Sequence, residues 1–126
     1  MVSYKQLLIE VAQYLETQGV GTVASNIFKG SLADKPTKAV AVLLSGGPRL
    51  RGDPIHRPSM QILVRDPAFD VGLVRAQDIY SLLDHTADKL TSIRGRCLAV
   101  TEPGSYYRDA NSNYIFPMNY TWYLNP

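Results

Sequence analysis

Apolar positions change their period part-way through the stretch Arg57–Asp84, and this change predicts a strand followed by a helix. In the first half, apolar and mixed positions alternate, with Met60, Ile62 and Val64 on one side. Alternating side chains lie on opposite faces of a strand, so this strand has one strongly apolar face. In the second half, Ala76, Ile79, Tyr80 and Leu83 recur on one side of a helix that Asp70 is expected to begin as N-cap. Because the connection is short, the helix must fold back over the sheet to which the strand belongs.

The N-terminal segment, about 3–18, also has helical spacing. Its apolar stripe consists of Tyr4, Leu7, Leu8, Val11, Ala12 and Leu15. Ser3 and Gln6 have the spacing of a capping box, and Gly19 and Gly21 are expected to end the helix. A helix with one apolar stripe would lie on the sheet.

Four further segments have strand-like patterns: 26–32, 39–45, 91–101 and 114–124. The second is apolar on both faces, which predicts an interior strand, and the third has an expected irregularity at Gly95. In the last segment one face is apolar and consists of Phe116, Met118, Tyr120, Trp122 and Leu124. Pro117 cannot donate to a ladder, so we expect a strand at the sheet edge or one that pairs fully only after Pro117.

The order of these elements predicts an α+β fold, a small mainly antiparallel or mixed sheet of four to five strands with two helices packed on one face. The chain has 126 residues, so we expect a single domain over 1–126.

A net charge of +2 is too weak to predict a nucleic-acid binder. Cys97 is the only cysteine, which excludes an internal disulfide and fits a reducing compartment. The N-terminus lacks the pattern of a signal peptide, and no apolar run reaches transmembrane length. We therefore expect a complete, soluble chain that is made in the cytosol.

Catalysis would require one of the two histidines, His56 or His85, to meet a nucleophile and an orienting carboxylate. The candidate nucleophiles are Ser45, Ser59 and Cys97. Asp53 shares a loop with His56, but no serine lies in a Gly-x-Ser-x-Gly elbow. We therefore expect that the chain is not an enzyme.

Asp84, His85 and Asp88 lie at the far end of the predicted second helix, where a spacing of four puts the two aspartates on the same side. A cationic histidine there would favour the helix dipole. With one cysteine and two distant histidines there is no zinc pattern, so helix-end electrostatics is preferred to a metal site. The loop that starts Ser45-Gly-Gly-Pro lacks the lysine of a phosphate-binding loop, and we expect no cofactor.

Arginines are frequent in the middle of the chain, and the chain has two long loops, 46–56 and 102–113. Tyrosines are abundant, and Tyr106 and Tyr107 lie in the second loop. Together these residue types suit single-stranded nucleic acid, but no ribonucleoprotein strand motif is present, so only a weak backbone contact stays open. Arginine and tyrosine are also enriched at protein interfaces. The candidate interface residues are Arg49, Arg51, Asp53, Tyr106, Tyr107 and Arg108.

From Gly30 onward the chain resembles the small minor capsid and tail-completion proteins of long-tailed bacteriophages, of the tail-terminator type. The matching segments follow the family's order and cover about three-quarters of the chain. They are Gly30-Ser-Leu-x-Asp-x-Pro, the apolar strand 39–44 with Gly46-Gly47, Arg57-Pro-Ser-Met-Gln-Ile-Leu-Val-Arg, Ala76-Gln-Asp-Ile-Tyr-Ser-Leu-Leu, and Glu102-Pro-Gly with Arg108-Asp-Ala-Asn and Tyr114-Ile-Phe-Pro-Met-Asn-Tyr. The chain departs from the family after Gly95, where the segment is short and contains Cys97.

The resemblance implies a structural role without catalytic residues, metal or cofactor. Such subunits form a ring, typically a hexamer, that caps the tail tube, ends its polymerisation and joins the tail to the capsid connector. The implied partners are other copies of the chain, the tail-tube protein and the neck or connector protein, and DNA would pass through the ring without sequence recognition. The implied location is the head-tail junction of the virion, after assembly in the host cytoplasm. A closed ring needs head-to-tail contacts between different patches of neighbouring subunits.

Two alternatives stay open at this stage. One is a head-tail adaptor or a tail-tube subunit of similar size. The other, from a different class, is a small nucleotide-binding or enzymatic α+β domain that uses the Gly-Gly-Pro loop.

Overall fold

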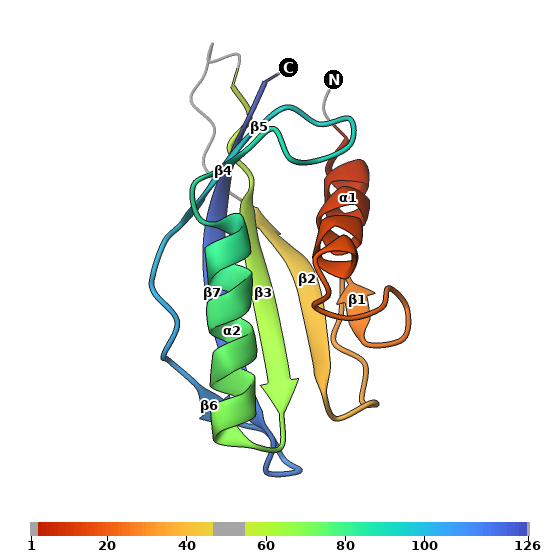
Figure 1. The fold of residues 1–126 in the computed structure, drawn as a ribbon, viewed down its shortest axis with the longest axis vertical. Helices are drawn as coiled ribbons and strands as arrows, with labels where there is room; N and C mark the ends of the chain where they lie inside the picture. Colours follow the sequence, from red (N-terminus) through yellow and green to blue (C-terminus); the bar gives the residue numbers. More distant parts are fainter. Residues whose placement is uncertain (1–2, 47–54, 126) are drawn as a thin grey trace.

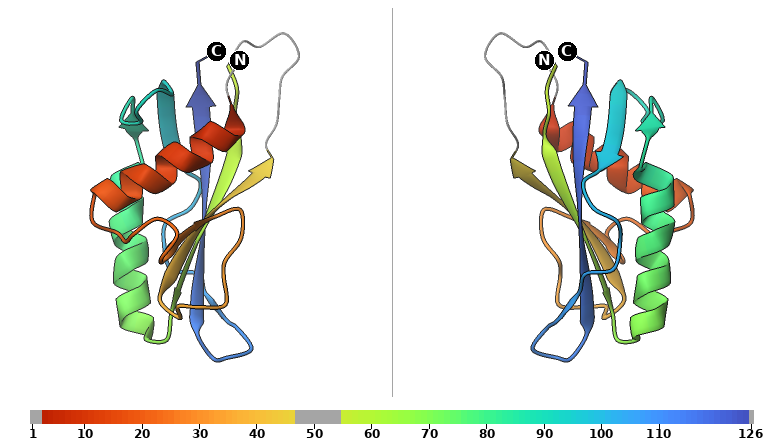
Figure 2. Two further views of the ribbon diagram at one scale, coloured as in Figure 1. Left: turned by 90° about the vertical axis from the view of Figure 1, so that its right-hand side faces the viewer. Right: turned by 90° about the vertical axis from the view of Figure 1, so that its left-hand side faces the viewer.

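The computed structural model describes residues 3–46 and 55–125, which form one mixed sheet and two helices. The elements are α1 (Tyr4–Thr17), β1 (Ile27–Lys29), β2 (Ala39–Gly46), β3 (Ser59–Asp66), α2 (Phe69–Leu83), β4 (Thr86–Ala87), β5 (Gly95–Ala99), β6 (Tyr107–Arg108) and β7 (Tyr114–Leu124). The strand order is β1-β2-β3-β7-β5-β4, and β6 pairs with β7. Both helices pack on the same face of the sheet (Figures 1 and 2). The predicted α+β class and the placement of the helices are confirmed.

The sheet has seven strands where four to five were predicted. The difference comes from β4 and β6, which have two residues each and are too short to show a period. The predicted strands 26–32 and 91–101 shorten to β1 and β5, and β1 pairs with β2 in parallel. No helix among residues 3–46 and 55–125 is long and apolar enough to cross a membrane.

Capping of the first helix was predicted correctly, and capping of the second was not. Ser3 Oγ accepts the N–H of Gln6 at 3.1 Å, as the capping box predicts. Helix α2 does not begin at Asp70; its N-cap is Ala68, which makes no side-chain cap bond. Instead, the buried carboxylate of Asp66 accepts the N–H of Ala68 at 2.8 Å. An aspartate before a proline forms a local turn with the backbone two residues on, and here that turn starts the helix.

The last strand lies inside the sheet, so the predicted edge position was wrong. The alternative, full pairing only after Pro117, holds for its pairing with β5. β7 pairs with β3 over eight consecutive positions and with β5 on its other side. The N–H groups of Trp122 and Leu124 donate toward the chain at the start of β3, and by alternation the nitrogen of Pro117 points away from β3. On the side of β7 that faces away from β3, β5 pairs only with residues 120–124 and β6 pairs only with residues 114–115. The missing N–H of Pro117 therefore falls in a gap between two partner strands.

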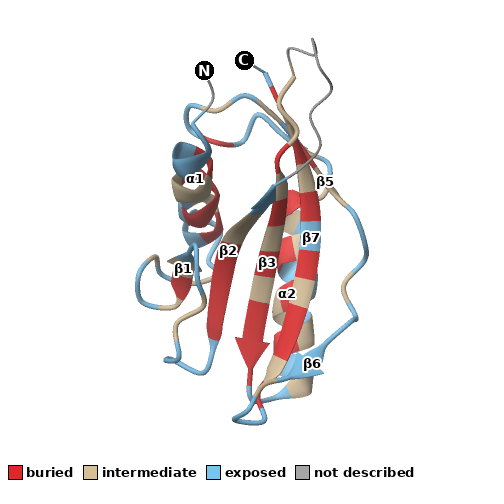
Figure 3. Ribbon diagram, turned by 180° about the vertical axis from the view of Figure 1, so that it is seen from behind, coloured by how far each residue is buried: buried red, intermediate tan, exposed pale blue. Residues whose placement is uncertain are grey.

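The core lies between the sheet and the helices. Its largest fully buried side chains include Trp122, Tyr120, Phe116, Leu7, Leu15, Ile27, Met60, Ile62, Ile79, Leu83 and Leu124. The predicted apolar faces of β3 and β7 both point into this core. The opposite face of the sheet has no helix over it (Figure 3). Near its β6 end the guanidinium of the buried Arg65 donates to the carbonyls of Ala33, Pro36 and Thr37, which holds loop 33–37 against that face.

Replacing Ile62 by aspartate should prevent folding. Ile62 is fully buried on β3, between β2 and β7, so the substitution places an unpaired carboxylate in the core at a cost of about 4 kcal/mol or more. Gln61→Asp, one residue away on the opposite face, is the control and should leave a cooperative thermal transition. A soluble Ile62→Asp variant with the wild-type melting temperature would refute the placement of β3.

Replacing Gly95 by alanine should destabilise the fold more than replacing Gly104. Both glycines have φ +152°, but a Cβ on Gly95 would lie 2.3 Å from the carbonyl oxygen of Tyr123, whereas nothing lies within 4 Å of one on Gly104. The two variants share the backbone strain, and only the first adds a clash with β7. We expect the loss of unfolding free energy in urea to be larger for Gly95→Ala by about 1 kcal/mol or more. Equal losses would show that β5 does not approach β7 at this point.

Candidate assembly surfaces

The described residues of the two loops predicted as interfaces lie at opposite ends of the molecule. Arg49, Arg51 and Asp53 fall outside the described residues. The chain re-enters the described part near the two termini, where His56 and Leu124 exchange backbone hydrogen bonds (Figure 1). Residues 106–108 lie at the far end, where β6 pairs with the start of β7. The described ends of the first loop are thus far from residues 106–108.

Tyr106 and Arg108 belong to a cluster of three aromatic rings and one guanidinium. We call this cluster the aromatic corner and define it as Phe69, Tyr106, Arg108 and Tyr114. The ring of Phe69 lies 5.1 Å from that of Tyr106 and 5.5 Å from that of Tyr114, both edge to face. Tyr106 and Tyr114 are 5.6 Å apart. The guanidinium of Arg108 covers the Tyr114 ring at 4.5 Å. Edge-to-face and cation–π contacts hold these side chains in place, although Tyr106 is 50% exposed.

A tight turn after Arg108 keeps the aromatic corner rigid. The carboxylate of Asp109 accepts the backbone N–H groups of Asn111 and Asn113, each at 2.9 Å. The hydrogen bond from the Asn113 backbone is the main cause that lowers the pKa of Asp109. Nη2 of Arg108 donates to the carbonyl of Ser112 at 2.9 Å. The segment predicted as a long polar loop therefore contains a short strand and an ordered hairpin.

Tyr107 lies on the other side of this hairpin. It pairs with Ile115, whose side chain is on the sheet face without helices, and alternation places Tyr107 on that face too. Its ring is 50% exposed. The three predicted residues 106–108 are therefore divided between two faces of the molecule.

A second apolar surface, which sequence reasoning missed, lies between the end of α1 and the outer side of α2. This groove has a volume of about 550 Å³. Its lining residues are Gln18, Gly19, Val20, Val71, Val74, Arg75, Asp78, Ser81 and Leu82, and we call it the valine groove. Val71 and Val74 are 44% and 55% exposed. The sequence did contain a sign of this surface, because these two valines lie outside the apolar stripe of the predicted helix.

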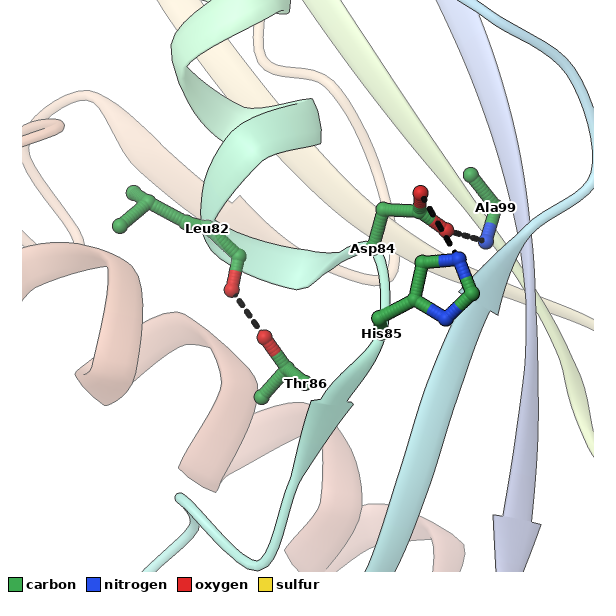
Figure 4. A network of polar contacts seen from close by, with 5 residues as sticks. All are labelled: Leu82, Asp84, His85, Thr86 and Ala99. Carbon is green, nitrogen blue, oxygen red and sulfur yellow. Dashed lines mark hydrogen bonds and ion pairs between the residues drawn. The ribbon is translucent and has the colours of Figure 1, made fainter.

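The carboxylates at the end of α2 accept hydrogen bonds from backbone N–H groups, and Figure 4 shows the one at Asp84. Asp84 is the C-cap of α2, and its Oδ1 accepts the N–H of Ala99 at 2.8 Å. His85 Nε2 lies 3.6 Å from Asp84 Oδ2. Asp88 is not on the same helix side as predicted, because β4 intervenes; its carboxylate accepts the N–H of Gly95 at 2.9 Å. Within the described ranges, no three His, Cys, Asp or Glu side chains form a metal-binding group.

The candidate nucleophiles do not meet the histidines in the described part of the chain. Cys97 is fully buried, and burial raises the pKa of its thiol, which keeps it protonated. His85 is 79% exposed at its side chain, and His56 Nδ1 lies 3.3 Å from the hydroxyl of Tyr4. No described serine or cysteine side chain is hydrogen-bonded to either imidazole.

The family profile described as "Bacteriophage tail terminator protein" matches residues 14–125. The chain belongs to the bacteriophage tail terminator family. The resemblance predicted from the sequence is therefore confirmed, and the chain is a tail structural protein of the bacteriophage type.

Solved structures share the fold of this tail terminator at low sequence identity. A chain from "Virion of native gene transfer agent (GTA) particle" is 15% identical, with TM-score 0.66 over 95% of each chain. A second solved chain is 12% identical, with TM-score 0.65 over 100% of this chain and 98% of its own. No match was found among curated proteins.

One buried charge in this tail terminator was not predicted, and it holds the fold around α1 together. Glu10 is 2% exposed, and its carboxylate accepts hydrogen bonds from the backbone and hydroxyl of Ser92, the backbone of Ile93 and the amide of Gln6. Burial by itself would raise the pKa of Glu10, but these hydrogen bonds outweigh it and lower the pKa below 4.5. Glu10 therefore fastens α1 to the segment that leads into β5.

Replacing Glu10 by glutamine should destabilise the chain in a pH-dependent way. At pH 7 we expect a loss of about 1–3 kcal/mol of unfolding free energy, because the charged acceptor of several donors is removed. The folded-state pKa of Glu10 is lowered, so its contribution is present above about 4.5 and is lost as pH falls through the folded-state value. Urea titrations at pH 7 and pH 3 should show the difference between wild type and variant shrinking in acid. Glu102→Gln, at an exposed glutamate, is the control; a pH-independent difference for Glu10→Gln would contradict this role.

Proposed function

We propose that this chain forms a closed ring that caps the tail tube, ends its polymerisation and joins the tail to the capsid connector. Family membership over residues 14–125 is the observation that supports this most strongly. We propose six subunits, a location at the head-tail junction and assembly in the host cytoplasm. DNA would pass through the ring without sequence recognition.

The distribution of surfaces supports a role in assembly. The end of the sheet that carries β6 and the end that carries the termini lie opposite each other, so one molecule can contact different partners at the two ends (Figure 1). A subunit between a tail tube and a connector needs two such ends. We propose the tail-tube protein and the neck or connector protein as these partners. We also propose Tyr106, Tyr107 and Arg108 as interface residues of the subunit, together with Arg49, Arg51 and Asp53, which lie outside the described residues.

We also propose that the protein works without catalysis or a cofactor. The tail terminator family is the basis for this proposal. The arrangement of the described side chains agrees with this proposal, since the carboxylates of Asp84, Asp88 and Glu10 all accept hydrogen bonds from backbone N–H groups.

Charge reversal at Arg108 should leave the subunit folded but weaken capping. Arg108 is exposed, so Arg108→Glu should change the melting temperature by only a few degrees. Electrostatic repulsion at a partner surface should lower the fraction of tube tips that carry a ring. The measurement is electron microscopy of tail tubes mixed with purified protein, counting tube tips that carry ring density. Lys29→Glu, an exposed cation on β1, is the control and should cap like wild type.

The same micrographs test the proposed function itself. Ring density at tube tips and an end to tube growth are expected for a terminator. Polymerisation of the purified chain into tubes would instead identify a tube subunit. Bare tips at all protein concentrations would refute the capping role, and equal capping by Arg108→Glu and wild type would refute only the Arg108 contact.

A further inference from the structure

We propose that neighbouring subunits join by docking the aromatic corner of one copy into the valine groove of the next, with Arg108 of one copy beside Asp78 of the other. The proposal rests on the proposed ring and identifies which surfaces of two copies meet in it. Both surfaces consist entirely of described residues.

The two surfaces lie on opposite flanks of α2. With about 3.6 residues per turn, the buried residues Gly72, Ala76, Ile79 and Leu83 define the side of α2 that faces the sheet. Phe69 lies to one side of this stripe and belongs to the aromatic corner, whereas Val71 lies to the other and faces the groove. A molecule therefore cannot fill its own groove with its own corner. Contact between these surfaces is head-to-tail, which is the type of contact that closes a ring.

Shape and polarity favour this pairing. The groove is a concave surface with two half-exposed valines, and the corner is a hairpin edge with the half-exposed ring of Tyr106. Aromatic residues and arginine are enriched where protein interfaces bury apolar area. The corner is already ordered by its ring contacts and by the Asp109 turn, so docking would lose little conformational entropy.

Charge decides which segment of a second copy fits the groove. Asp78 is exposed on the groove wall, and its carboxylate makes no hydrogen bond or ion pair with a described residue. Arg108 uses Nη2 for Ser112 and one face for Tyr114. A guanidinium has five N–H donors, so it can still donate to a carboxylate. The hairpin thus presents a cation next to an aromatic ring. The groove presents the carboxylate of Asp78 beside two valines, with Arg75 also in its lining.

A charge-swap series on the full chain tests the pairing. Asp78→Arg and Arg108→Glu should each weaken self-association by about tenfold or more, because each brings like charges together at the contact. The double variant restores one opposite pair per interface and should recover most of the wild-type association. Association is measured by sedimentation velocity over a concentration series, and by ring density on tail tubes if the free protein is monomeric. Thermal melting confirms that each variant is folded.

A second pair of variants tests the apolar part of the contact. Val74→Glu places a carboxylate in the groove and should weaken association by about tenfold. Val100→Glu makes the same change at a valine that is 61% exposed and lies outside both surfaces, and should leave association unchanged. Equal loss in both variants would show a general effect of charge and would overturn the proposal.

The remaining outcomes separate this inference from the ring itself. If both single charge-reversal variants form rings as well as the wild type does, the proposed docking is wrong, but the proposed ring is not refuted. Two weakened single variants without recovery in the double would also overturn it, and would assign the groove to another partner such as the tube protein. A chain that neither associates nor decorates tube tips would refute the ring, and the docking with it.

Discussion

Pairing of β3 with β7 is the interaction on which the other parts of this protein depend. It joins eight positions in register, and both strands turn their apolar faces toward the helices. β7 then carries β5 and β6 on its free side, and β3 carries β2. The short turn after β3 sets the direction of α2 across the same sheet. A charge at Ile62 would therefore disturb every other element and not one contact alone.

The assembly surfaces follow from the position of α2 on this sheet. Because one stripe of the helix is buried, its two flanks are turned in opposite directions, one toward β6 and one toward α1. Contacts from β6 and β7 complete the first flank as an ordered aromatic surface, and the end of α1 completes the second as a groove. A single buried stripe thus produces two different exposed surfaces, which is the minimum that a head-to-tail ring needs.

Buried charged residues connect the loops to this frame. Glu10 accepts donors from the segment before β5, and Arg65 donates to three carbonyls of the segment before β2. Asp66 accepts the backbone at the start of α2, while its Oδ2 has no hydrogen-bond partner among the described residues. Most hydrogen bonds of these three charged side chains are made with backbone groups. The side chains therefore hold the loops against the sheet and α1.

Periodicity in the sequence determined the main elements, because burial on one side of a helix or strand leaves a direct trace in residue order. It predicted both helices and the faces of β3 and β7, and the ordered motifs predicted the family. The tertiary structure alone decided the interior position of β7, since the gap that accommodates Pro117 depends on where β5 ends and β6 begins. It also decided the roles of Glu10 and Asp66, and it separated Tyr107 from Tyr106 and Arg108. These features depend on partners that are distant in the chain. The local order of residues does not predict which distant backbone group a side chain will contact.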